Sequence, residues 1–358
     1  MYSDDDLQSA VSSGALSAEA ADALRAHVAT RHAMPLGDEE HFRLITGFND
    51  IFVTIAVAMI LVAMAGIGQV FTPNLDGPPP FSGLLIAGAS WTMAEFFTRK
   101  RRMALPSIVL LLAFVGGVME SLLGFMVLAF DGQDPNERLA AGLVAGSALL
   151  TAGAAWLHWR RFMVPITVAA GAAAVAATVI ALILAAIGPE NLEPESTLMP
   201  LVFAAGIAIF AFAMRWDMSD RTRTTRRSDV AFWLHLLAAP MIAHPLFYWL
   251  GITRGDTVGV GGVVGVLLVY VALGLVALAI DRRALLVSAL AYVLAALTWL
   301  FDRFGAVELN IALTALVIGS ALLTLSAFWT PIRRSVVAML PGNLQARLPV
   351  TGVALASA

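Results

Sequence analysis

The sequence predicts an all-α integral membrane protein with about ten transmembrane helices, arranged as successive hairpins with both termini in the cytoplasm. With 59% hydrophobic and 13% charged residues and a mean hydropathy of +0.83, the chain differs clearly from soluble proteins, which average ~45–50% apolar and ~25% charged residues. Its apolar runs are long enough to cross a hydrocarbon core ~30 Å thick. All of its 22 lysines and arginines except Arg138, Arg254 and Arg303 fall in the N-terminal segment, the even-numbered connections and the C-terminal tail. Because basic residues near span ends are retained in the cytoplasm, both termini are predicted inside.

The first 35 residues predict a small cytosolic helical hairpin. Gly14 ends its first helix, and Ser17 caps the second. The apolar face of these helices is too small for independent stability, so we expect it to dock on a protein partner or on the rest of the chain. Residues 36–50 then form a membrane-proximal segment.

The transmembrane domain is predicted over residues 51–329. The proline-rich stretch at 76–80 cannot be helical and separates the first two spans. Residues 330–358 are too proline-rich for another span and are predicted to be a cytosolic tail. The expected spans are 51–70, 81–98, 104–130, 139–157, 163–187, 198–214, 230–250, 257–280, 284–301 and 307–329.

Arginine pairs recur on the predicted cytoplasmic side. The spacing Arg-Arg-x3-Pro occurs twice, which fits either a chain of hairpins anchored at the inner headgroups or a duplicated unit of the kind found in transporters. The loop at 221–227 is a candidate site for anionic lipid, although topology alone also explains its charge. The pairs predicted as topology anchors are Arg101 and Arg102, Arg160 and Arg161, Arg226 and Arg227, Arg282 and Arg283, and Arg333 and Arg334.

Two glycine pairs predict close contact between helices. Gly142 and Gly146, and likewise Gly261 and Gly265, are four residues apart within apolar spans. Small residues at this spacing let helix backbones approach each other in membranes.

Glu120 is the main candidate for chemistry inside the membrane. It lies near the middle of the third span, where an ionisable side chain costs free energy. Such a residue is therefore expected to have a structural or functional role. His244 lies at a similar depth in the seventh span, which Pro240 and Pro245 interrupt, so that backbone carbonyls become free. With Asn310, these two residues form a candidate proton or solute site. The alternative is that each makes a structural hydrogen bond between helices.

Two further residues are weaker candidates. His235 lies nine residues before His244, about half a turn away in direction, so the two histidines do not obviously converge. Glu95 lies four residues before Arg99, and an ion pair within the helix is a sufficient explanation for it.

Several blocks resemble a family of uncharacterised bacterial multi-pass inner-membrane proteins that begin with a cytosolic helical hairpin. The blocks are Leu7-x3-Val11-x2-Gly14-x-Leu16-Ser17-x-Glu19-Ala20-x3-Leu24, the stretch Arg215-Trp216-Asp217-Met218-Ser219-Asp220, and Trp329-x-Pro331-x-Arg333-Arg334. The resemblance implies a bacterial inner-membrane location. It implies no biochemical activity, catalytic residue or ligand.

The composition argues against several function classes. The chain has no cysteine, which excludes disulfides and thiolate metal sites. No recognised catalytic, nucleotide or metal-binding motif occurs, so we expect no catalytic residue, no metal and no cofactor. A net charge of −3 gives no reason to expect a nucleic-acid partner.

Three function classes remain open. A non-enzymatic membrane protein with an envelope or scaffold role explains every feature. A secondary transporter or permease for a small solute, coupled to protons through the Glu120 and His244 site, is the alternative. A membrane-embedded enzyme has the least support. Convergence of Glu120, His244 and Asn310 on a polar cavity would favour transport.

Overall fold

The computed structural model describes residues 9–24, 48–130, 135–188, 194–223, 225–251, 260–303 and 310–350. Within these ranges all regular elements are helices, and no strand occurs. The chain divides into two compact units. The first contains Met1–Phe42 and Gly352–Ala358, and the second contains Arg43–Thr351.

The first unit contains the predicted helical turn at Gly14. Residues 9–12 and 18–24 are helical. Gly14 has a φ of 74°, and the next two backbone N–H groups donate to the carbonyl of Ala10, which closes the first helix. The Ser17 hydroxyl accepts a hydrogen bond from the N–H of Ala20 at 3.1 Å, as a helix N-cap should. The rest of the expected hairpin and most of the segment 36–50 lie outside the described residues.

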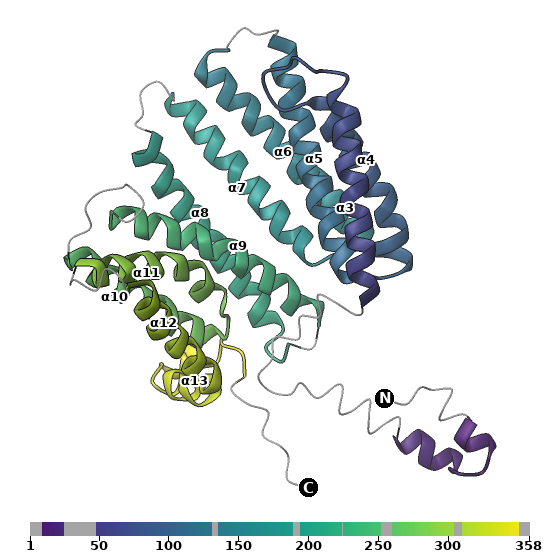
Figure 1. Cartoon of the computed structure of the whole chain (residues 1–358), viewed down its shortest axis with the longest axis vertical. Coiled ribbons are helices and arrows are strands. Elements are labelled where there is room, and N and C mark those ends of the chain that lie inside the picture. Colours follow the sequence, from purple (N-terminus) through teal and green to yellow (C-terminus); the bar gives the residue numbers. More distant parts are fainter. Residues whose placement is uncertain are drawn as a thin grey trace. The chain divides into compact units, whose positions relative to one another are not determined.

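The second unit contains the apolar helices (Figure 1). A helix lies in every predicted span, and two short helices follow in the predicted tail. The helices are α3 (Phe48–Gln69), α4 (Pro80–Ala94), the π-helix η1 (Glu95–Lys100), α5 (Ala104–Phe130), α6 (Glu137–Phe162), α7 (Ile166–Ile187), α8 (Pro194–Ser219), α9 (Arg226–Trp249), α10 (Val260–Ile280), α11 (Ala284–Arg303), α12 (Asn310–Ala327), α13 (Trp329–Ala338) and α14 (Gly342–Gln345).

The all-α membrane class is confirmed, and the described helices give an approximate span count close to the predicted ten. Among the described residues, 8 helices are long and apolar enough to cross a membrane. A ninth is added if α12 and α13, which meet at a bend of 75°, form one broken span. The second predicted span is different because α4 has only 15 residues and continues as the six-residue π-helix η1.

Neighbouring helices pair as hairpins, as the sequence predicts. The most extensive packing joins α4 with α5, α6 with α7, and α8 with α9. In contrast, α7 and α8 contact each other little, although they are consecutive in the chain, and α7 packs more extensively on α9. The helices therefore form two groups, α3 to α7 and α8 to α13, that meet mainly through α7 and α9 (Figure 1).

The first group is held by glycines other than the predicted pairs. A methyl group added to Gly117 of α5 would lie 2.6 Å from the carbonyl oxygen of Gly83, and one added to Gly83 of α4 would lie 2.5 Å from that of Gly117. The backbones of α4 and α5 are therefore in direct contact. Gly124 makes an equally close approach to the carbonyl of Pro78.

The prediction that the two glycine pairs form helix contacts is wrong for three of the four glycines. A methyl group added to Gly142, Gly146 or Gly261 would meet no described atom within 4 Å beyond the helix's own backbone. Gly265 alone lies close to a neighbour, the side chain of Leu250. Spacing identifies a small-residue face, but the partner helix decides whether the face is used.

The largest hydrophobic core lies in the second group and includes part of the predicted tail. Leu234, Phe247 and Leu285 are among its fully buried members, and Trp329, Val337 and Leu348 belong to the same cluster. Residues up to about 350 therefore pack with the helices instead of forming a separate tail. Many large apolar side chains remain exposed on the long helices, such as Met59 and Leu323, which fits contact with lipid chains.

Candidate functional site

The structure does not join the predicted pair Glu120 and His244. Glu120 is half-buried in α5 and has no hydrogen-bond or ion-pair partner among the described residues. His244 of α9 is hydrogen-bonded through Nδ1 to the Tyr292 hydroxyl of α11 at 2.6 Å. Tyr292 also stacks on Phe247, with ring centroids 4.4 Å apart. Asn310 is the first residue of α12, and its side chain lies outside the described residues.

Glu95 forms a forked ion pair that joins two helices. Its carboxylate accepts hydrogen bonds from Arg161 Nε at 2.6 Å and Nη2 at 2.9 Å, and from Arg99 at 3.3 Å. The pair with Arg99 is the one that the sequence predicts. The pair with Arg161 connects η1 to the end of α6 and could not be read from local spacing, because the two residues are 66 positions apart.

A buried cluster centred on Asp217 joins three parts of the second group. Asp217 of α8 accepts a hydrogen bond from Arg282 Nη2 at 2.6 Å through one oxygen and is 2.9 Å from His235 Nε2 through the other. Arg282 Nη2 also approaches the Ser228 carbonyl and hydroxyl oxygens at 3.1 and 3.3 Å. Asp217, His235 and Arg282 are at most 2% exposed. The cluster therefore ties α8 and α9 to the turn between α10 and α11.

The hydrogen bonds assign the tautomer of His235. Its Nε2 faces a carboxylate oxygen, so this nitrogen must carry the proton and donate. Its Nδ1 is buried and has no hydrogen-bond partner among the described residues, and the ring packs edge-on against Phe210. A proton on Nδ1 would be a buried donor without an acceptor, which is costly. His235 is therefore the neutral Nε2–H form.

A second cluster surrounds Asp281, the residue next to Arg282. Asp281 accepts hydrogen bonds from Arg223 Nη1 at 2.8 Å and from the Trp329 indole at 2.7 Å. Its carboxylate is also 3.5 Å from Arg333 Nε. Because Asp281 and Arg282 are adjacent residues of the turn between α10 and α11, the two clusters are directly connected. We call them together the polar junction: Asp217, Arg223, Ser228, His235, Asp281, Arg282, Trp329 and Arg333.

Two arginines bind the backbone that follows α14. Arg221 Nε donates to the Leu348 carbonyl at 2.8 Å, and Arg333 Nη2 donates to the Pro349 carbonyl at 2.8 Å. A third bond joins Arg333 Nη1 to the Val350 carbonyl at 3.3 Å. The side of the helices that carries the polar junction thus also holds residues 348–350.

The arginine pairs that the sequence predicts as membrane anchors differ in how deeply their side chains are buried. In the pairs 282–283 and 333–334 the first arginine is buried and the second is exposed. Adjacent residues in a helix point in directions about 100° apart, so one can face the core and the other the surroundings. Arg283 lies over the Trp329 ring, and Arg226 donates to the Met163 carbonyl. The remaining pairs, 101–102 and 160–161, lie in exposed positions.

The sequence analysis did not identify a site formed by Asp217, Asp281 and Arg282. A usable signal was present, since Asp217 lies three residues after the predicted span 198–214, and an acid so close to the membrane needs a partner. Its partners could not be named, because Arg282 is 65 residues away.

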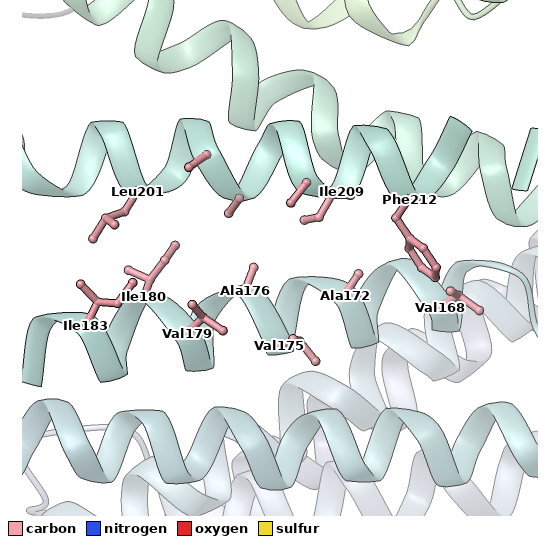
Figure 2. A pocket seen from close by; sticks show the side chains of 13 residues that line it. Val168, Ala172, Val175, Ala176, Val179, Ile180, Ile183, Leu201, Ile209 and Phe212 are labelled. Atoms are coloured by element: carbon pink, nitrogen blue, oxygen red, sulfur yellow. The ribbon is translucent and has the colours of Figure 1, made fainter. Parts of the chain in front are cut away.

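A second feature is an apolar pocket between α7 and α8, which we call the α7–α8 pocket. It has a volume of about 590 Å³. Figure 2 shows Leu201 opposite Ile183 at one end and Phe212 opposite Val168 at the other. All of the lining side chains are apolar: Val168, Ala172, Val175, Ala176, Val179, Ile180, Ile183, Leu201, Ala204, Ala205, Ala208, Ile209 and Phe212.

The two carboxylates of the polar junction accept hydrogen bonds from arginine, histidine and tryptophan side chains of other segments, and these bonds tie the segments together. Among the described residues, no group of three or more histidine, aspartate or glutamate side chains is placed to hold a metal ion. Comparison with protein-family models, curated proteins and solved structures finds no match for this chain.

Proposed function

We propose that this chain is a non-catalytic integral membrane scaffold of the bacterial inner membrane, with both termini and the polar junction in or facing the cytoplasm. The observation that carries the proposal is the way in which Asp217 is bound. The groups that bind it, His235 of α9 and Arg282 of the turn between α10 and α11, are buried and directed at this carboxylate. Such an arrangement stabilises a fixed helix packing rather than a reaction or a permeation path.

The location and orientation rest on the sequence. The resemblance of the blocks at 215–220 and 329–334 supports a bacterial inner-membrane protein. The distribution of basic residues supports the inward orientation, because the polar junction lies at the connections that carry most of them. The N-terminal hairpin is then available to a soluble partner in the cytoplasm.

Labelling of single cysteines tests the orientation. The chain has no native cysteine, so each substitution introduces a unique thiol. In the connection before α9, Thr225 is not suitable for substitution by cysteine, because its hydroxyl caps α9 and binds Asp220. Arg227→Cys and Asn74→Cys are better, since both residues are exposed and lie at opposite ends of the hairpins. An impermeant maleimide added to intact cells should label Asn74→Cys and leave Arg227→Cys unlabelled. The reverse pattern would overturn the orientation.

A flux measurement tests the scaffold proposal against the transporter alternative. The purified protein in liposomes should produce no pH-dependent flux above that of empty liposomes, and Glu120→Gln and His244→Ala should change nothing in this respect. The geometry gives the alternative no specific support, because His244 is bound to Tyr292. A flux that both substitutions abolish, while the thermal unfolding midpoint is unchanged, would show that the chain is a transporter.

A further inference from the structure

We propose that the α7–α8 pocket binds an acyl chain of an anionic phospholipid, whose phosphate lies beside Arg215 and Arg226. The inference requires that the chain spans a membrane. It depends neither on the scaffold role nor on which side is cytoplasmic.

The shape of the pocket fits a lipid chain. Its lining extends along α7 from Val168 to Ile183, which corresponds to about 22 Å of helix. One leaflet contributes about half of a ~30 Å hydrocarbon core, so the pocket is long enough for the full depth of a leaflet. A lining without polar side chains offers nothing to a hydrophilic solute, whereas an acyl chain needs only apolar contact.

The pocket is also accessible from the bilayer. Val175 and Val179, two of its lining residues on α7, are each 50% exposed, and Phe212 on α8 is 41% exposed. The two helices pack mainly on other partners, α7 on α6 and α8 on α9. In a membrane, lipid surrounds the space between these two helices. A lipid chain in the pocket makes the van der Waals contacts that an empty pocket would lack.

Positive charge gathers at one end of the pocket. Arg215 follows Phe212 by three residues on α8, so the two side chains are neighbours on the helix surface. Arg226 donates to the carbonyl of Met163, in the turn that leads into α7 shortly before Val168. Both arginines are exposed, and Arg215 has no partner among the described residues.

The two arginines orient the lipid, because they attract a phosphate at the Phe212 end of the pocket. This positive charge selects an anionic phospholipid over a zwitterionic one, since each nearby arginine favours binding to an anionic lipid surface by about fivefold.

Fluorescence quenching at a residue that lines the pocket tests the proposal, and a second residue of the same helix serves as the control. Ala208→Cys attaches a fluorophore to a lining residue, and Ala211→Cys attaches it to an exposed residue of the same helix that does not line the pocket. The full-length protein is placed in phosphatidylcholine vesicles that contain increasing fractions of phosphatidylglycerol or phosphatidylcholine brominated on the acyl chain. Bromine quenches the fluorophore only on close approach.

Brominated phosphatidylglycerol should quench Ala208→Cys at a several-fold lower fraction than brominated phosphatidylcholine, and the two lipids should quench Ala211→Cys equally. Arg215→Gln with Arg226→Gln should remove the preference at Ala208→Cys. Arg334→Gln, which removes from α13 a charge that is also exposed, should preserve the preference. High salt should weaken the preference without any substitution.

Three results would overturn the proposal. Equal quenching of Ala208→Cys by both lipids would show that the pocket does not select for charge. A preference that survives the double substitution would place the phosphate elsewhere. Quenching by both lipids that falls as more protein is added per vesicle would mean that a second copy of the chain covers the pocket.

Discussion

Asp217 illustrates how a single residue determines local structure in this protein. Its two oxygens bind His235 of α9 and Arg282 of the turn between α10 and α11, and all three residues are buried. Removing the carboxylate would leave a buried guanidinium without its counter-charge, and this is far more costly than never having buried the pair.

Asp217→Ala is therefore expected to lower the free energy of unfolding by about 3–5 kcal/mol. The measurement is denaturant or thermal unfolding of the purified protein in detergent. Asp76→Asn, at an exposed aspartate in the α3–α4 connection, is the matched control and should change stability little. Equal effects of the two substitutions would contradict the role assigned to Asp217.

Backbone conformation provides a second comparison at the scale of residues. Met163 and Asp281 both have positive φ angles, 56° and 58°, at the ends of helices. A left-handed conformation costs a residue with a Cβ roughly 1–2 kcal/mol and costs glycine almost nothing. The side chain of Met163 is 43% exposed, whereas that of Asp281 binds Arg223 and Trp329.

Met163→Gly should leave stability unchanged or raise it by up to about 1 kcal/mol, because the strain is relieved and little is lost. Asp281→Gly should instead lower the free energy of unfolding. The loss of the hydrogen bonds from Arg223 and Trp329 outweighs the same relief of backbone strain. Unfolding midpoints of the two variants should therefore shift in different directions. A gain in stability from Asp281→Gly would argue against the polar junction as a stabilising unit.

At the scale of elements, the contact between α4 and α5 depends on missing side chains. Gly83 and Gly117 allow the two backbones to touch, and the neighbouring Gly116 points into open space. In a bilayer, such close van der Waals contact supplies much of the attraction between helices, because lipid is as apolar as leucine.

Gly117→Ala is expected to destabilise the protein by about 1–3 kcal/mol, since the methyl group would overlap backbone atoms of α4 that cannot move easily. Gly116→Ala is a control on the same helix and should be neutral or slightly stabilising, because alanine favours the helix more than glycine. Thermal unfolding in detergent separates the two cases. Similar losses from both would mean that helix propensity, not packing, governs these positions.

At the scale of the whole molecule, residues 9–24 and residues 348–350 differ in the unit to which they belong. Residues 9–24 belong to a separate unit, whereas Leu348 is buried in the main core and residues 348–350 bind Arg221 and Arg333. The ends should therefore respond differently to deletion.

Deletion of residues 1–35 should leave membrane insertion and thermal stability unchanged. Truncation after Leu340 should lower the free energy of unfolding by at least ~2 kcal/mol, the value of burying one leucine, and leave two arginines without their carbonyl partners. Membrane fractionation and unfolding curves of both variants check this. Failure of the N-terminal deletion to insert would show that the hairpin is needed for assembly.

The sequence by itself determined the all-α membrane class, the places of the helices, the end of the first helix at Gly14 and the ion pair of Glu95 with Arg99. These features depend on hydropathy, turn residues and neighbours within one helical turn, which are local along the chain. The same reasoning could not recognise that α4 is short, that η1 is a π-helix or that α13 bends away from α12.

The tertiary structure alone decided which polar residues meet. It paired His244 with Tyr292 instead of Glu120, joined Asp217 to Arg282, and left Gly142 and Gly146 open while Gly83 and Gly117 touch. Periodicity shows which residues share a helix face, but it cannot show which helix lies opposite or how the two are rotated. In a membrane, where every helix is apolar, hydropathy no longer distinguishes one neighbour from another, so these pairings depend on side-chain contacts between distant parts of the chain.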